Sequence, residues 1–145
     1  MKREDFPAPR DGVIITHFLV VRDQDTSREW YRDVLGAEVV NEHDPVILKF
    51  HNSWLILNVG GGPTDDKPGV TLGPPDDLSR TSAFLNLRVS GIGQVLTEWS
   101  ARGAEFLTPP IDRGAEIRCY IRDPDGHLIE VGQATGVLES LEEEG

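Results

Sequence analysis

The hydrophobic and polar positions of this chain follow an order that occurs twice. A β-branched run over residues 12–23 predicts a strand, and residues 26–40 follow with the punctuation of a helix at both ends. Thr26 and Glu29 have the spacing of a capping box, in which each side chain satisfies a free backbone N–H at a helix start. Gly36 suits the left-handed position just after a helix end. We therefore expect one strand followed by one helix.

The second half of the chain repeats this order. Residues 82–89 predict a strand, and the apolar residues after it fall at i, i+3, i+4 and i+7 of a helix, namely Ile92, Val95, Leu96 and Trp99. The tripeptide Gly-Ala-Glu follows both helices, beginning at positions 36 and 103. The same offset of 67 residues separates His17 from Phe84 in the two leading strands. The agreement of the two offsets indicates an internal repeat.

Each predicted helix is followed by strand-like segments that pair as a hairpin. Residues 46–51 and 53–60 form the first hairpin, and residues 116–123 and 127–133 form the second. Pro and Gly at the tip of the second hairpin, positions 124 and 126, suit positions i+1 and i+3 of a type I turn. Each half of the chain is therefore predicted to be a βαβββ module.

These modules predict an α+β fold in which two βαβββ units form a curved, half-closed mixed sheet with a concave pocket. We expect a single domain over residues 1–145, with module 1 at about 12–60 and module 2 at about 82–134. A Gly-, Pro- and Asp-rich loop at about 60–81 connects them, and its length favours a functional or mobile segment. The acidic C-terminal tail, about 135–145, is expected to be a solvated or frayed helix.

Charge and composition narrow the classes of partner. The formal net charge of -11 and the scattered distribution of the 14 Lys and Arg residues argue against nucleic acid. No stretch approaches the roughly 20 apolar residues of a membrane span, so we expect a soluble protein without a membrane partner. One cysteine, Cys119, excludes an internal disulfide and favours a cytoplasmic setting, with Cys119 as a buried thiol.

Side-chain alternation places a carboxylate among polar residues on one sheet face. If His17 faces the concavity, the following residues face it too: Leu19, Val21, Phe84, Asn86, Arg88, Leu128, Glu130 and Gly132. Glu130 is then either paired with an arginine, Arg88 or Arg118, or unpaired, with a raised pKa suited to a general base. His17 is either a hydrogen-bonded core residue or a metal ligand.

The paired βαβββ halves, His17 in the first strand, WYRDVLG at residues 30–36 and RDPDGHLIEV at residues 122–131 together resemble the vicinal oxygen chelate superfamily. This group includes glyoxalase I, bleomycin resistance proteins and extradiol dioxygenases. The resemblance covers about residues 12–134. It implies metal ligands in the first and last strand of each module, which correspond here to His17, Asn58, Phe84 and Glu130.

Two of these four positions hold side chains that are poor metal ligands. Phe84 cannot coordinate a metal, and Asn58 offers one neutral oxygen. The resemblance thus implies a metal set of His17, Glu130 and Asn58 for Zn, Ni, Fe or Mn, with fewer strong donors than a catalytic centre usually has.

Two functions stay open. One is a glyoxalase-type isomerase, lyase or dioxygenase, with His17 and Glu130 as catalytic residues. The other is a metal-free protein that sequesters a drug or metabolite. In both, the expected partner is a small molecule held by Phe84, Asn86, Arg88, Leu19 and Leu128. The resemblance and the predicted edge strands also favour a homodimer.

Overall fold

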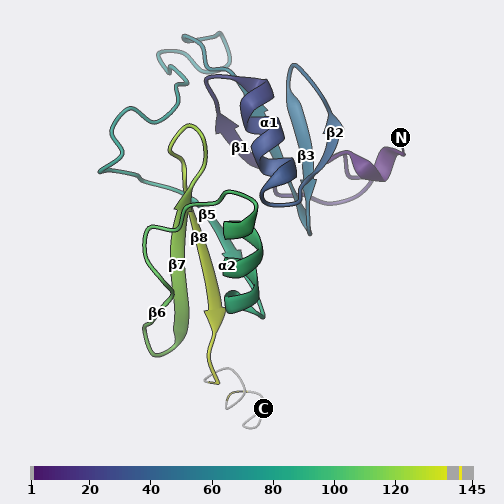
Figure 1. The fold of residues 1–145 in the computed structure, drawn as a ribbon. Coiled ribbons are helices and arrows are strands. Elements are labelled where there is room, and N and C mark those ends of the chain that lie inside the picture. The colour runs from purple at the N-terminus through teal and green to yellow at the C-terminus, as the bar shows by residue number, and fades with distance from the viewer. Residues whose placement is uncertain (1, 137–140, 142–145) are drawn as a thin grey trace. The chain divides into compact units, whose positions relative to one another are not determined.

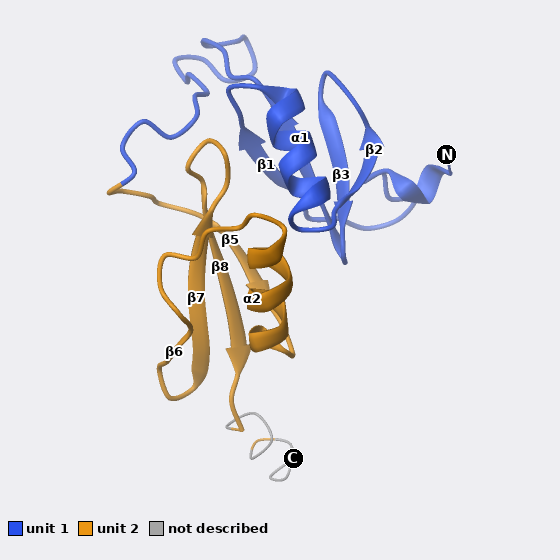
Figure 2. Ribbon diagram, in the orientation of Figure 1, with its two compact units in different colours: residues 1–78 blue, residues 79–145 orange. Residues whose placement is uncertain are grey.

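The computed structural model describes residues 2–136 and residue 141, and it divides the chain into two compact units (Figure 2). Unit 1 comprises residues 1–78 and unit 2 comprises residues 79–145. Each unit contains one strand, one helix and three further strands in that order (Figure 1). The predicted α+β fold with two βαβββ modules is confirmed. The predicted acidic tail lies almost entirely outside the described residues.

Unit 1 is a four-stranded mixed sheet with one helix. After a short 3-10 helix, Arg3–Asp5, its elements are β1 His17–Val20, α1 Gln24–Asp33, β2 Glu38–Asn41, β3 Val46–Phe50 and β4 Ser53–Asn58. The strand order is β1-β4-β3-β2, in which β1 and β4 are parallel and the other neighbours are antiparallel. The core of this unit includes Tyr31, Leu48, Leu55 and Leu57.

The start of helix α1 differs from the predicted capping box. The N-cap is Asp23, which has an extended backbone and accepts a hydrogen bond of 3.1 Å from the backbone N–H of Thr26. Thr26 therefore lies inside the helix, and the prediction that Thr26 and Glu29 form the cap was wrong. A carboxylate three residues before an N–H can satisfy that donor as well as a hydroxyl can. Gly36 does adopt the left-handed conformation expected of it, with φ of 81°.

Unit 2 has the same topology. Its elements are β5 Leu85–Arg88, α2 Ile92–Ala101, β6 Ile111–Asp112, β7 Glu116–Arg122 and β8 Leu128–Ala134, in the sheet order β5-β8-β7-β6. The predicted turn between β7 and β8 is confirmed, because Gly126 N donates to Asp123 O at 3.0 Å. The Asp123 carboxylate also accepts hydrogen bonds of 2.9 Å from the backbone N–H groups of Asp125 and His127.

One face of the unit 2 sheet is closed by apolar packing. Ile121, Ile129 and Val131 are fully buried, and Trp99 of α2 is buried as well. Cys119 belongs to this core, as predicted, and burial raises the pKa of its thiol. A raised pKa keeps the thiol protonated and unreactive near neutral pH. Helix α2 therefore covers an ordinary hydrophobic layer.

The connecting segment folds onto unit 1 up to residue 78. Gly61 and Leu72 exchange two backbone hydrogen bonds of 3.0 and 2.9 Å. Gly60 makes this approach possible, because a Cβ at that position would lie 2.0 Å from the carbonyl oxygen of Leu72. Within the described part of the chain, neither α1 nor α2 is long and apolar enough to cross a membrane.

Candidate functional site

The face of the unit 2 sheet opposite α2 is polar, unlike the face that the helix covers. Ile129 and Val131 alternate along β8 with Glu130 and Gly132, so the latter two project to the side away from α2. Leu128 of β8 lies on the same side, and each neighbouring strand adds three residues: three from β7, and two from β5 together with Phe84 just before it. We call the resulting set the polar face. Its members are Phe84, Asn86, Arg88, Glu116, Arg118, Tyr120, Leu128, Glu130 and Gly132.

Glu130 lies at the centre of the polar face and is only 4% exposed. Its Oε1 accepts a hydrogen bond of 2.7 Å from the Tyr120 hydroxyl. Its Oε2 accepts a hydrogen bond from the Asn86 amide and lies 3.5 Å from Nη1 of Arg88. A buried carboxylate is tolerated when such donors replace water. The apolar strand can therefore carry Glu130 because three side chains on neighbouring strands satisfy it.

A second carboxylate, Glu116, joins the two arginines of the polar face. Arg88 Nη2 lies 2.8 Å from one oxygen of Glu116, and Arg118 Nη1 donates to the other oxygen at 2.8 Å. Hydrogen bonds from Arg118 and then Arg88 hold the pKa of the Glu116 carboxyl below its usual value. The bond to Glu116 raises the pKa of Arg118. The two guanidinium groups are thus fixed beside each other by a shared anion.

Gly132 provides the space in which the Arg88 guanidinium lies. A Cβ at position 132 would come within 2.3 Å of Nη1 and 3.0 Å of Cζ of Arg88. Any larger residue would therefore move the end of the arginine away from the sheet. The glycine lets Arg88 lie flat across β8 and reach both Glu130 and Glu116.

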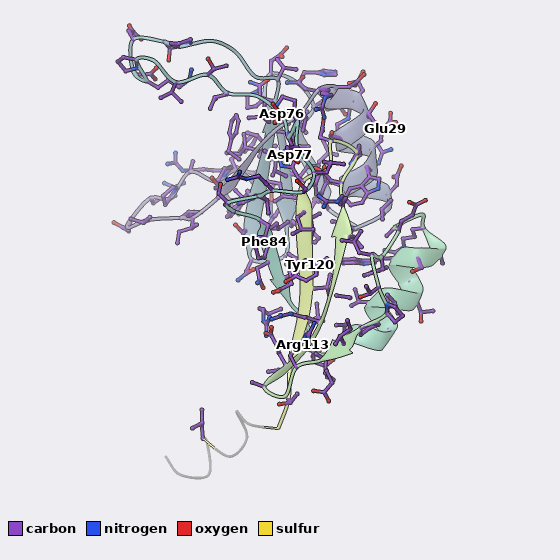
Figure 3. The ribbon with its side chains drawn as sticks, turned by 90° about the vertical axis from the view of Figure 1, so that its left-hand side faces the viewer. Glu29, Asp76, Asp77, Phe84, Arg113 and Tyr120 are labelled. Carbon is purple, nitrogen blue, oxygen red and sulfur yellow. The ribbon has the colours of Figure 1, made fainter. Side chains whose placement is uncertain are left out.

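An aromatic pair borders the carboxylate. The rings of Phe84 and Tyr120 are 6.0 Å apart between centroids, with an interplanar angle of 71°. Figure 3 shows both residues on the side of the strands away from α2. The hydrogen bond to Glu130 raises the pKa of Tyr120, because the phenol must keep its proton to donate it. Phe84 is 38% exposed and gives the polar face an accessible apolar edge.

The residues of unit 1 that were predicted for the site do not share one environment. His17 is the first residue of β1 and is half-buried, whereas Leu19 is buried in the core. Strand pairing brings Val20 beside Asn58, as it brings Asn86 beside Glu130, so Val20 is the residue equivalent to Asn86. The shared site of His17 and Glu130 involves both units and stays a prediction.

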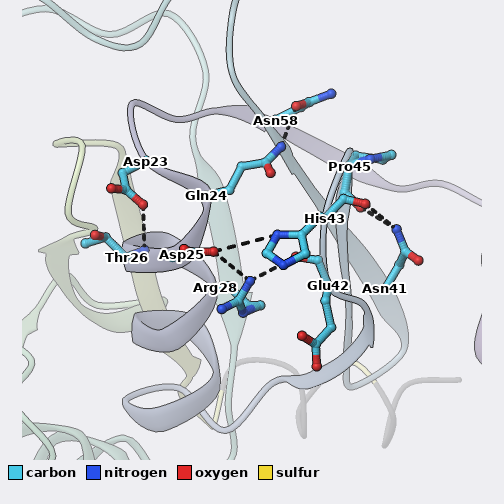
Figure 4. A network of polar contacts seen from close by, with 10 residues as sticks. All are labelled: Asp23, Gln24, Asp25, Thr26, Arg28, Asn41, Glu42, His43, Pro45 and Asn58. Atoms are coloured by element: carbon cyan, nitrogen blue, oxygen red, sulfur yellow. Dashed lines mark hydrogen bonds and ion pairs between the residues drawn. The ribbon is translucent and has the colours of Figure 1, made fainter.

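Asn58 has its side-chain oxygen engaged within unit 1. Its Oδ1 accepts a hydrogen bond of 2.5 Å from Nε2 of Gln24 (Figure 4). The same oxygen accepts a hydrogen bond of 2.9 Å from the backbone N–H of Val59. Gln24 begins α1, so this bond ties the end of β4 to the start of the helix. An amide oxygen that already accepts two hydrogen bonds is a poor metal ligand.

The contacts that Asn58 and Glu130 make within their own units do not favour a firmly held metal ion. In the described ranges, no three or more His, Cys, Asp or Glu side chains gather as a metal-binding group. A divalent cation at Glu130 would compete with the Tyr120 hydroxyl and the Asn86 amide for the carboxylate oxygens, and it would lie close to the positive Arg88 guanidinium. The donor set on the polar face is therefore suited to hydrogen bonding rather than to coordination.

Sequence reasoning missed two members of the polar face, Tyr120 and Glu116. The signal for both was the hairpin turn. Once the Asp123–Gly126 turn is placed, antiparallel register pairs Tyr120 with Glu130 and Glu116 with Ala134. The possible pairing of Glu130 with Arg88 is observed at 3.5 Å, whereas Arg118 pairs with Glu116.

Comparison with known sequences identifies one family. The family model of the Glyoxalase/Bleomycin resistance protein/Dioxygenase superfamily matches residues 14–131. The chain is also 25% identical over 124 residues to biphenyl-2,3-diol 1,2-dioxygenase 3 of Rhodococcus globerulus. This match covers 81% of the chain and 61% of the dioxygenase, so the chain spans less than two thirds of that relative.

Comparison with solved structures supports the same fold. A virulence protein of Salmonella typhimurium is 30% identical, with a TM-score of 0.62, over 83% of this chain and 96% of the other. An antibiotic binding protein from Streptomyces sp. CB03234 is 16% identical, with a TM-score of 0.64, over 88% of this chain and 100% of the other. The second likeness is one of fold alone.

Proposed function

Because the chain belongs to the glyoxalase/bleomycin resistance protein/dioxygenase superfamily, we propose that it binds a small organic molecule against the polar face of unit 2, without a firmly held metal ion. One observation carries this proposal. Glu130 is buried in the middle of a face that α2 does not cover, and three side chains from neighbouring strands hold its carboxylate.

Folding alone gives little reason for this arrangement. Desolvating a carboxylate costs several kcal/mol, which hydrogen bonds and a nearby cation only about offset, and an apolar residue of similar volume often serves the fold as well. A fixed array of donors and acceptors beside exposed apolar surface is, in contrast, what orients a small molecule in a binding site. The polar face combines both features through Glu130, Tyr120 and Phe84.

The relatives support the same class of ligand. One is named for its action on biphenyl-2,3-diol and another for binding an antibiotic, and both ligands are small organic molecules. The aromatic edge of Phe84 and Tyr120 suits a planar ring, since aromatic pairs favour edge-to-face and offset contacts. Sequestration without turnover is the form of binding that this donor set favours.

The proposal is tested by a thermal-shift screen with planar antibiotics and catechols, followed by calorimetric titration of the hits. At a hundredfold excess over the dissociation constant, a bound ligand should stabilise the protein by about 2.7 kcal/mol. Glu130→Gln should weaken each confirmed hit at least about tenfold. Glu98→Gln is the matched control, because Glu98 is exposed on α2 and its loss changes the net charge equally. A flat response across the screen contradicts the proposal.

A second candidate is a proton-transfer enzyme. It is favoured by the 2.7 Å hydrogen bond between the Tyr120 hydroxyl and Glu130, which places a phenol and a carboxylate where both can exchange protons with one ligand. Its test is deuterium incorporation next to the carbonyl of a bound keto compound, followed by NMR. Incorporation by the parent and not by Glu130→Gln supports catalysis, and equal background rates in both remove it.

A further inference from the structure

We infer that the molecule bound at the polar face carries an anionic oxygen group, a carboxylate or phosphonate, and that Arg88 and Arg118 receive it. The inference rests on the proposed function and specifies its ligand. The four charged groups of the polar face are the two arginines together with Glu116 and Glu130, so their formal charges cancel. The exposure of each charged side chain decides whether an approaching ligand first meets a positive or a negative group.

The cations of the polar face are more exposed than the anions. The side chains of Arg88 and Arg118 are 47% and 36% exposed. Those of Glu116 and Glu130 are 23% and 6% exposed. The carboxylates therefore lie beneath the guanidinium groups and fix them in place, and an approaching ligand meets the positive groups first.

Both guanidinium groups keep donors for a ligand. A guanidinium has five N–H donors in a planar fork that matches two oxygen atoms of one anion. Glu116 engages Nη1 of Arg118, and the two carboxylates together engage Nη1 and Nη2 of Arg88. Among the described contacts, Nε and Nη2 of Arg118 and Nε of Arg88 hold no other anion. The shared Glu116 keeps the two forks side by side, which lowers the cost of ordering them around a ligand.

The aromatic edge lies beside the arginines. Tyr120 and Arg118 project from β7 on the same face two residues apart, a separation of about 7 Å along a strand. A ligand with a planar ring and an acidic group at one end matches this spacing, with the ring near Phe84 and Tyr120. The remote negative charge of the chain acts weakly on such contacts, because salt at physiological strength screens charges beyond about 8 Å.

The experiment compares 2-naphthoate with 2-naphthamide, which have the same ring and nearly the same size but differ in charge. Calorimetric or fluorescence titration of the full chain should give about tenfold or tighter binding of the carboxylate. Added NaCl should weaken naphthoate and leave naphthamide nearly unchanged. This comparison needs no variant, so it stays decisive if a substitution disturbs folding.

Four variants locate the preference. Arg88→Met and Arg118→Met should each reduce naphthoate binding toward that of naphthamide. Gly132→Ala keeps every charge but pushes the Arg88 guanidinium aside, and should lower the preference severalfold. Arg102→Met is the control, because Arg102 lies at the end of α2 and its loss changes the net charge equally. Circular dichroism confirms folding of each variant.

The outcomes separate this inference from the proposed function. Naphthamide binding as tightly as naphthoate, or equal losses in Arg102→Met and the two polar-face variants, overturns the anionic ligand while binding itself stands. If neither compound binds and the antibiotic and catechol screen is also flat, both the inference and the proposed function fail. A salt-sensitive preference for naphthoate that Arg88→Met and Arg118→Met abolish supports the inference.

Discussion

At the scale of single residues, the polar face depends on a few contacts whose protonation states are coupled. The Tyr120 hydroxyl donates a hydrogen bond to the Glu130 carboxylate, and two arginines stabilise Glu116 as an anion. Glu130 was predicted from the sequence because a carboxylate in an apolar strand needs partners. Tyr120 was not, because a tyrosine in a strand is ordinary and only the hairpin register pairs it with Glu130.

The coupling of Tyr120 to Glu130 can be measured directly. Glu130→Gln should lower the pKa of Tyr120 toward 10, since the anion that favours the protonated phenol is gone. The parent should accordingly lose this part of its stability as pH rises through the raised pKa, and keep it fully below pH 10. Absorbance titration at alkaline pH follows the phenolate, and Tyr120→Phe assigns the signal against Tyr31. An unchanged titration in Glu130→Gln contradicts the hydrogen bond.

Glu116 contributes stability that is lost at acid pH, whereas the contribution of Tyr120 is lost at alkaline pH. Its pKa is lowered by Arg118 and Arg88, so its stabilising effect is present above the ordinary carboxyl value of 4.5 and is lost as pH falls below it. Glu116→Gln should therefore flatten the acid side of the stability curve relative to the parent. Urea unfolding at a series of pH values between neutral and about 3 measures this. Parallel curves for parent and variant would show that the ion pairs are too screened to matter.

At the scale of elements, hydrophobic pattern and turn chemistry predicted the order of strands and helices because both are local. The two helices, the glycine after the first one and the Pro-Asp-Gly turn were all visible as spacings. The start of α1 was missed because two capping patterns overlap there. Asp23 and Thr26 both suit an N-cap, and their relative merit depends on the backbone conformation at residue 23.

The cap assignment gives a test at this scale. Asp23→Ala should lower the free energy of unfolding by about 0.5–2 kcal/mol, because it leaves the N–H of Thr26 without its acceptor. Thr26→Ala should have a smaller effect, since Thr26 contributes only its backbone N–H to that bond. Chemical denaturation measures the free energy of unfolding of both variants. A larger loss for Thr26→Ala than for Asp23→Ala would instead support the predicted capping box.

At the scale of the whole molecule, repetition allowed the βαβββ architecture to be predicted, yet the two copies are not equivalent in chemistry. Val20 and Asn58 of unit 1 stand where unit 2 has Asn86 and Glu130. The offset of 67 that aligns the helix ends is 72 between Asn58 and Glu130 and 66 between Val20 and Asn86. A one-residue slip reverses which side chains share a face, so sequence alignment alone was unable to place Leu19 and His17.

Metal content tests the chemistry of the whole chain. Protein incubated with Zn, Ni, Fe or Mn and then desalted should retain much less than one equivalent, because Asn58 and Glu130 already hold hydrogen-bond donors. Elemental analysis of the parent, His17→Ala and Glu130→Ala should give similar low values. Stoichiometric metal in the parent that both variants lose would instead support the glyoxalase-type enzyme.

The bare α-carbon at position 132 has a practical meaning for engineering. The Arg88 guanidinium packs directly against Gly132, so one added methyl group at this position would shift the positive charge of Arg88 without removing it. Substitutions at position 132 alone should therefore change how strongly the polar face prefers acidic over uncharged ligands. They should leave the hydrophobic layer beneath α2 unchanged.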